Sequence, residues 1–272
     1  MKLPKTLKKL FRFAVDNYFI SILLACIAFV VFVSAYKLFF VKPTYVYVKV
    51  KMGQGLWWAN TAKPSLWFIK SIKKGGVERD LTRKPMAEIL SVRYYPWWGS
   101  NQYDVYLTMK LKVSESKSTG KYSFNRSTIG VGAPVDFEFP NAQFSGTIIQ
   151  MSRSPIKEKF ITKTVTLVKK WAFPWEGEAI IIGDKYFDGE ETVFKIVGKQ
   201  IEPSQETYSL SGTYYAVETE RKINITLKTK IKLKKEGDEL IFGEDQVINL
   251  GKTINIATDN FTFSDYVVNG IE

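Results

Sequence analysis

Two stretches of the chain carry one pattern: IGVGAPVDFEFPNAQFS at residues 129–145 and INLGKTINIATDNFTFS at residues 248–264. The matching pairs are Gly132 and Gly251, Val135 and Ile254, Phe137 and Ile256, Asn141 and Asn260, Phe144 and Phe263, and Ser145 and Ser264. Alternation of apolar and polar residues with period two is typical of β-strands. A glycine just before each strand permits the positive φ of a tight entry turn. The pattern therefore predicts that one β-domain is present twice.

A second match lies upstream, between residues 105–113 and 225–233. Its pairs are Val105 and Ile225, Leu107 and Leu227, Lys110 and Lys230, Leu111 and Ile231, Lys112 and Lys232, and Val113 and Leu233. Successive strand residues point to opposite faces, so this pattern gives one apolar face and one lysine-rich face. We expect an all-β ectodomain made of two tandem repeats of a small antiparallel β-barrel or sandwich.

The boundaries of the two copies follow from the strand and turn signals. Alternation begins at residues 44–51, and no convincing amphipathic helix follows residue 40. We place copy one at residues 44–152 and copy two at residues 162–272. Residues 153–161, which are polar and include Pro155, suit a short linker. The strand-turn-strand segment 180–189 of copy two has a degraded counterpart near residues 72–76.

An uncharged apolar run occupies residues 17–36. A helix of about 20 residues spans a hydrocarbon core of roughly 30 Å. The preceding basic residues are Lys2, Lys5, Lys8, Lys9 and Arg12, and the positive-inside rule keeps such a tail in the cytoplasm. We predict a cytoplasmic tail at residues 1–16, a transmembrane helix at 17–41 and extracytoplasmic β-domains, in a single-pass protein of the cytoplasmic or inner membrane.

Two other interpretations of the same run remain open. Val33-Ser34-Ala35 fits a signal-peptide cleavage site, and Leu23-Leu24-Ala25-Cys26 resembles a lipobox. The apolar run continues past both, whereas a signal peptide has an apolar region of about 7–15 residues. An uncleaved anchor is therefore favoured.

Composition removes several classes of chemistry. The chain has no histidine and one cysteine, Cys26. Histidine-based triads, histidine-ligated zinc and internal disulfides are excluded, and no phosphate-loop or dinucleotide motif is present. The formal net charge is +12, but the lysines alternate along strands and no nucleic-acid-binding motif accompanies them. We expect a protein that is not an enzyme, needs no cofactor and binds no nucleic acid.

Three sets of residues are weak candidates for binding or catalysis. Asp184, Asp188 and Glu190 surround two glycines and offer calcium ligands, although EF-hand spacing is absent and an ordinary hairpin is the favoured interpretation. Trp57, Trp97 and Trp175 offer aromatic faces for a sugar, against core or interface packing. The spacings of Asp136 with Glu138, and of Glu176 with Glu178, suit paired carboxylates, although an ordinary polar strand face explains them.

The duplicated layout resembles a family of bacterial single-pass membrane proteins whose domain has no assigned function. The resemblance rests on the apolar run, residues 45–50, the turn 183–189, and segments 129–135 and 144–149. It implies an anchored β-rich ectodomain. Residues 131–135 and 146–149 are also similar to β-domains of membrane-fusion adaptors and of mammalian-cell-entry-type lipid carriers.

These features lead to one functional expectation and several alternatives. We expect a non-catalytic cell-envelope protein that presents two β-domains to other envelope proteins, with oligomers possible. One alternative is an accessory subunit of envelope transport or secretion, and another is a carbohydrate-binding protein. A further alternative is a hydrolase acting through Asp136, Glu138, Asp184 and Asp188.

Overall fold

The computed structural model describes residues 17–40, 43–53, 63–97, 102–211 and 213–272. The chain divides into two compact units, Met1–Thr44 and Tyr45–Glu272, and the second unit contains both β-domains. Each unit is described by itself.

The first unit contains the helix α2 (Tyr18–Phe40). Apolar side chains such as Phe19, Ile22 and Phe29 are exposed on it. Within the described residues, no helix combines the length and the apolar character required to cross a membrane.

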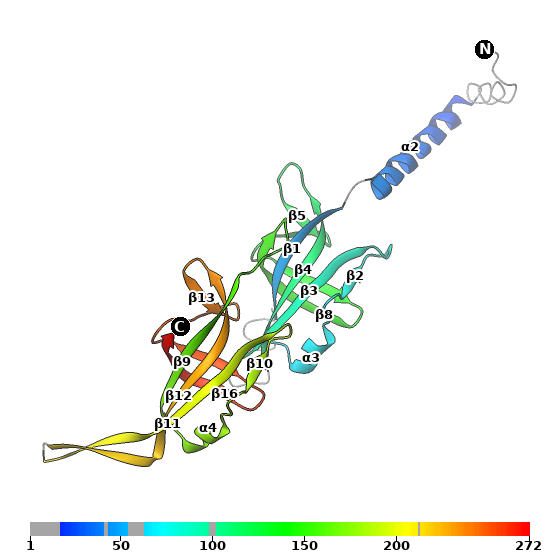
Figure 1. Ribbon diagram of the computed structural model, residues 1–272. Helices are drawn as coiled ribbons and strands as arrows, with labels where there is room; N and C mark the ends of the chain where they lie inside the picture. Colours follow the sequence, from blue (N-terminus) through cyan, green and yellow to red (C-terminus); the bar gives the residue numbers. More distant parts are fainter. Residues whose placement is uncertain (1–16, 41–42, 54–62, 98–101, 212) are drawn as a thin grey trace. The chain divides into compact units, whose positions relative to one another are not determined.

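The second unit is mostly β and contains two barrel-like sheets in tandem (Figure 1). The first has the strand order β2-β3-β4-β1-β8-β7, with the hairpin β5–β6 attached to β4. Its strands are β1 (Thr44–Met52), β2 (Val77–Arg79), β3 (Pro85–Pro96), β4 (Tyr103–Glu115), β5 (Tyr122–Phe124), β6 (Ser127–Ile129), β7 (Pro134–Phe139) and β8 (Ala142–Ser152).

The second sheet has the order β10-β11-β12-β9-β16-β15, with the hairpin β13–β14 attached to β12. Its strands are β9 (Phe160–Ala172), β10 (Lys185–Phe187), β11 (Thr192–Leu210), β12 (Thr213–Glu236), β13 (Glu239–Phe242), β14 (Gln246–Val247), β15 (Thr253–Ala257) and β16 (Thr262–Ile271). The two orders agree strand for strand, so the predicted tandem repeat of β-domains is present. We call the domains domain one and domain two.

The repeat extends to irregularities in the ladders. The β3–β4 ladder shifts register between Ile89 and Ser91, and the β11–β12 ladder shifts between Ile196 and Gly198. The sequences of the two domains align without a gap only until shortly after Ser145 and Ser264. Domain two carries an extra bulge there, at Asp265 with φ 61°, so Tyr266 faces Ile254 as Gly146 faces Val135.

Each domain buries its own apolar core. Leu107, Phe137 and Ile148 belong to the core of domain one, and Leu227, Phe194 and Phe263 belong to that of domain two. Tyr95 and Tyr106 lie on strands of domain one yet pack into the second core. The two domains are therefore joined by buried side chains and not only by the chain between them.

The structure adds two elements that the sequence pattern did not predict. Short helices α3 (Leu66–Ser71) and α4 (Pro174–Ala179) occupy the same place in each repeat, although the sequence shows no convincing amphipathic helix after residue 40. Each has 6 residues, too few to show a 3.6-residue period. Domain two also carries a long ribbon where domain one has only six residues, 97–102, between its strands, because the pair Pro96–Tyr103 corresponds to Pro203–Ile223.

Candidate functional site

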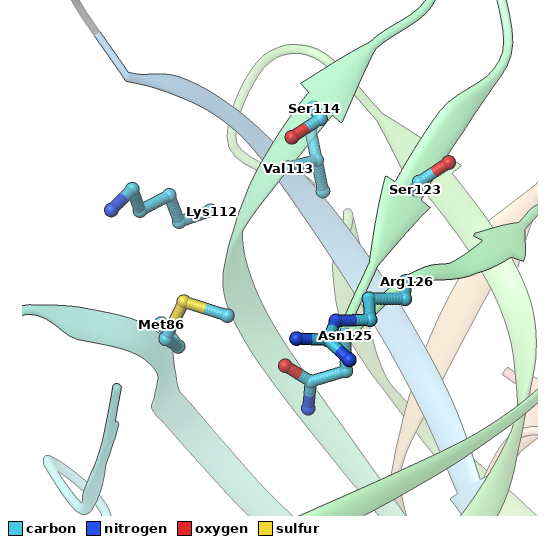
Figure 2. Close-up of a pocket in the computed structure, with 7 residues that line it drawn as sticks. All are labelled: Met86, Lys112, Val113, Ser114, Ser123, Asn125 and Arg126. Carbon is cyan, nitrogen blue, oxygen red and sulfur yellow. The ribbon is translucent and has the colours of Figure 1, made fainter. Parts of the chain in front are cut away.

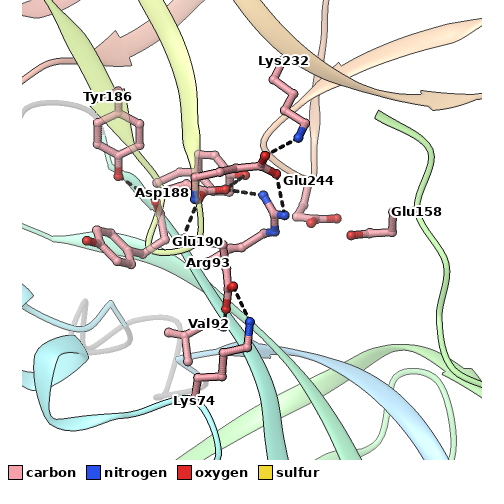
Figure 3. Close-up of polar contacts among 12 residues, drawn as sticks. Lys74, Val92, Arg93, Glu158, Tyr186, Asp188, Glu190, Lys232 and Glu244 are labelled. Atoms are coloured by element: carbon pink, nitrogen blue, oxygen red, sulfur yellow. Dashed lines mark hydrogen bonds and ion pairs between the residues drawn. The ribbon is translucent and has the colours of Figure 1, made fainter. Parts of the chain in front are cut away.

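The most elaborate polar constellation in the second unit lies where the two domains meet (Figure 3). The end of β3 contacts the turn that follows β10. The Tyr94 N–H donates to the Asp188 carbonyl at 2.8 Å, and the Tyr186 hydroxyl donates to the Tyr94 carbonyl at 2.7 Å. The Val92 N–H donates to Glu190 Oε1 at 3.2 Å. Backbone groups of domain one are thus paired by a turn of domain two.

Asp188 is the centre of this junction and is fully buried. Its Oδ1 accepts the N–H groups of Glu190 and Glu191, both at 2.9 Å. Its Oδ2 accepts from the Arg93 guanidinium and from the Tyr95 hydroxyl, the latter at 3.1 Å. Oδ1 therefore caps the turn of domain two, and Oδ2 binds domain one across the junction.

The charges of the junction perturb one another. Burial by itself would lower the pKa of the Arg93 guanidinium. The negative charges of Asp188 and Glu191 have the larger effect, so the pKa is raised. Burial and the Asp188 charge together raise the pKa of Tyr95. Burial would raise the pKa of Glu191, but Lys232 and Arg93 outweigh it and hold that pKa below its usual value. Arg93 therefore stays a cation and Tyr95 stays a donor at neutral pH.

A second ionic cluster joins the domains nearby. The Lys49 ammonium is 2% exposed and contacts both Glu158 and Glu244. Tyr106 donates to Asp245 at 3.3 Å, on the same turn as Glu244. Burial would raise the pKa of Glu158, but Lys49 and then Lys234 hold it below its usual value. A buried lysine paired with two carboxylates is a device for fixing one arrangement of the two domains.

The calcium candidates do not converge on one point. Asp188 and Glu190 belong to the junction, where Glu190 also pairs with Lys74 at 2.6 Å. Asp184 instead accepts from the Asn260 amide at 2.9 Å. Across the described residues there is no group of three or more acidic or cysteine side chains placed to hold a metal ion. Protein donors thus occupy Asp188, Glu190 and one oxygen of Asp184, whereas the buried Asp184 Oδ2 has no hydrogen-bond partner within the described residues.

The tryptophan candidates have different surroundings. Trp57 lies outside the described residues. Trp97 is half exposed, and the Lys63 ammonium lies 2.8 Å from the centre of its ring. Trp175 is 60% exposed and stacks on Phe173 at 6.5 Å between ring centroids. The corresponding residue of domain one is Trp67, the second residue of α3, which is 75% exposed.

Trp175 belongs to an exposed aromatic surface, which we call the α4 patch (Trp171, Phe173 and Trp175). All three side chains are exposed. The Lys222 ammonium lies 3.1 Å from the centre of the Phe173 ring. Large aromatic side chains with an adjacent cation are typical of binding surfaces rather than of an idle solvent face.

The paired-carboxylate candidates separate into two environments. Glu176 is buried and accepts from Lys169 at 2.6 Å and from the Phe173 N–H at 3.1 Å, while Glu178 is exposed. Asp136 and Glu138 line a groove at the edge of domain one together with Glu78.

Glu78 is the residue of that groove that sequence reasoning missed. It is 8% exposed, its Oε1 accepts from the Asn125 amide at 3.3 Å, and its Oε2 has no partner. Burial raises the pKa of Glu78. The strand Val77–Arg79 gives no periodic signal, because a segment of 3 residues is too short to show one.

No protein-family model, curated protein or solved structure matches the chain.

Proposed function

We propose that the chain is a non-catalytic, membrane-tethered protein of the cell envelope whose two β-domains act as one rigid binding module. The junction carries this proposal. Asp188, Arg93 and Lys49 are the kind of polar residues a catalytic site requires, yet Asp188 pairs with Arg93 across the two domains and the buried Lys49 pairs with Glu158 and Glu244. Their role is to hold surfaces in a fixed arrangement.

The tether is the helix α2 together with the basic residues before it. The uncharged run at 17–36 and the exposed apolar side chains of α2 support an anchor whose amino-terminal tail lies in the cytoplasm. The β-domains would then face the extracytoplasmic space.

The partner surface in this proposal is the α4 patch, and the partner is another envelope protein. Tryptophan and phenylalanine are enriched at the centres of protein interfaces, where a polar rim surrounds them. Lys222 beside Phe173 and the exposed Glu178 of α4 provide such polar surroundings.

Photocrosslinking in intact cells tests the proposal. A photoreactive amino acid replaces Trp175, and as a matched control it replaces Glu239, which is exposed at the start of β13. We expect reproducible protein adducts from position 175 and none from position 239. Adducts to lipid alone, or adducts no more abundant than at position 239, would contradict a protein partner.

A second candidate function is carbohydrate binding, favoured by one observation. Trp67 and Trp175 hold equivalent positions in the two domains and are both largely exposed, so the module presents a repeated aromatic face. Aromatic faces of this kind suit sugar rings. Isothermal titration with envelope glycan fragments distinguishes the candidates, since a sugar site requires heat of binding that the Trp67→Ala and Trp175→Ala variants lose.

A further inference from the structure

Domain one has a groove bounded by β2, by the turn between β5 and β6 and by β7, and the equivalent place in domain two lies between β10, the turn between β13 and β14, and β15. The strand registers show which positions of the two domains are equivalent. Glu78 corresponds to Tyr186, Phe124 to Phe242 and Asn125 to Gly243. The two Asp residues that follow the short strands, Asp80 and Asp188, also correspond. Each caps its own turn: Asp80 Oδ1 accepts from the Thr82 N–H at 2.8 Å, as Asp188 Oδ1 accepts from Glu190.

In domain two this groove is occupied by a segment of domain one. The Tyr95 ring packs on Phe242 at 5.6 Å between centroids and lies beneath Gly243, where a Cβ would be 3.5 Å from the ring. Asp188 Oδ2, the carboxylate oxygen that does not cap the turn, accepts hydrogen bonds from Arg93 and from the Tyr95 hydroxyl. The groove of domain two is therefore a docking site for an extended segment that carries an arginine and a tyrosine.

In domain one the equivalent groove is open, with a volume of about 570 Å³. Among the residues that the structure describes, Glu78 Oε2 is buried there without a hydrogen-bond partner, and Asp80 Oδ2 is paired with Lys112 alone, at 4.0 Å. Asp136 and Glu138 line the same groove, and Arg79 and Arg126 are the cations on its wall. Carboxylates outnumber cations in this groove, although the chain as a whole is strongly basic.

The groove continues into a neighbouring cavity of about 820 Å³ (Figure 2). Figure 2 shows Asn125 and Arg126 on the hairpin turn, with Met86 and Lys112 across the cavity from them. Met86 supplies an apolar surface beside the carboxylates. The combined site is long enough and mixed enough in character for an extended peptide.

We propose that the groove of domain one binds an extended segment of a partner protein that carries a cationic side chain beside an aromatic one, as the groove of domain two binds Arg93 and Tyr95. The cation would pair with Glu78 Oε2 and with Asp80 Oδ2. The aromatic ring would lie over Phe124 and Met86. A buried carboxylate without a partner is costly to the fold, and a bound cation offsets that cost.

A second copy of this chain is a poor occupant. In domain two the register places Gln200 where Arg93 stands and Glu202 where Tyr95 stands. Glu202 would bring a negative charge to a groove of carboxylates. The occupant is therefore a different protein.

Peptide binding to the detergent-solubilised full chain tests the proposal. The probe is a fluorescein-labelled peptide of sequence SVRYYP, which copies residues 91–96, and its analogue carries glutamine in place of arginine. We expect saturable binding of the first peptide with a Kd below about 1 mM and at least about tenfold weaker binding of the analogue. Loss of binding by about tenfold is also expected for Glu78→Gln.

Two further variants locate the site. Asp136→Asn changes an exposed side chain on β7 and should also weaken binding without disturbing the fold, whereas Glu88→Gln removes a charge from β3 outside the groove and should leave binding unchanged. No saturable binding of SVRYYP overturns the proposal. Equal binding of the two peptides, or equal binding to wild type, Glu78→Gln and Asp136→Asn, overturns it as well.

Discussion

Asp80 and Asp188 show how one residue of the repeat has acquired different tasks. Both cap the turn after a short strand through Oδ1. Only Asp188 also uses Oδ2, to bind Arg93 and Tyr95, and only Asp188 is fully buried. The local turn requires an acceptor at this position, and the docking of the domains adds a requirement for charge.

Asp188→Asn separates these two tasks. Asparagine keeps an oxygen that can cap the turn. Its amide group, which is a donor, would face the Arg93 guanidinium in place of the carboxylate, so Arg93 loses one of its two negative partners. Breaking a buried pair in this way costs about 3–5 kcal/mol. We expect urea denaturation, followed by tryptophan fluorescence, to show a loss of that order in the free energy of unfolding. The control Asp80→Asn, at a more exposed site, should cost clearly less than Asp188→Asn; equal losses would refute the role of Asp188.

Glu78 and Glu191 should respond to pH in opposite directions. The pKa of Glu78 is raised in the fold, so its charged form weakens the fold above that pKa, and protonation removes the penalty as pH falls. The pKa of Glu191 is lowered, so its contribution is present above the unfolded pKa of about 4.3 and is lost as pH falls through the folded pKa.

The matching variants are Glu78→Gln and Glu191→Gln, and the measurement is the free energy of unfolding at pH 7 and at pH 3. Glu78→Gln should stabilise the protein by about 1 kcal/mol at pH 7, and the gain should vanish at pH 3. Glu191→Gln should destabilise it at pH 7, with the loss shrinking at pH 3. A gain from Glu78→Gln that does not depend on pH would show that the charge of Glu78 is not the cause.

Among the elements, the turn between β10 and β11 determines how closely the domains approach. A Cβ at Gly189 would lie 2.5 Å from the Val92 carbonyl oxygen, whereas Gly183 has nothing within 4 Å of a Cβ. The two glycines have similar φ angles, 107° and 102°. They therefore share the strain of a left-handed backbone and differ in the contact across the junction.

Replacing each glycine by alanine isolates that contact. Gly183→Ala should cost about 1–2 kcal/mol from backbone strain alone. Gly189→Ala should cost a further ~1–3 kcal/mol, because the added methyl group must displace β3. Thermal unfolding monitored by circular dichroism measures both. If the two variants unfold at the same temperature, the close approach at Gly189 contributes nothing to stability.

The strands were predictable from sequence because their alternation is local. A buried strand face can be recognised within a few residues, as it is at Leu107 and Leu227 and at Phe137 and Ile256. The helices α3 and α4 are too short to show a period, and the ribbon at 204–222 is an insertion with no counterpart of similar length between β3 and β4.

The sites were less predictable than the strands. Asp188 and Glu190 were singled out as acidic loop residues, but their partners Arg93 and Lys74 lie far away in sequence, so nothing local indicates that they meet. Trp57 lies outside the described residues, and Trp97 and Trp175 are exposed, as a binding role requires. Glu78 gave no sequence signal, because its burial arises from the turn Asn125-Arg126 and from β7.

At the scale of the whole molecule, the proposal depends on α2 lying in a membrane, and the chain carries its own probe for this. Cys26 is the sole cysteine of the sequence, and its side chain is exposed on α2. Since no part of the chain that the structure describes covers it, a bilayer would shield this thiol from a water-soluble reagent. We expect a polyethylene-glycol maleimide to leave Cys26 unmodified in intact membranes and to modify it fully in dodecyl sulfate.

The orientation follows from a second thiol in a chain that carries Cys26→Ala. Ser116 is exposed in the turn after β4, so Ser116→Cys should react in intact spheroplasts if the β-domains face outward. A thiol at position 116 that reacts only after lysis would place the domains in the cytoplasm. Rapid labelling of Cys26 in intact membranes would instead remove the anchor and, with it, the tethered module, whereas the contacts between the two domains would stand unchanged.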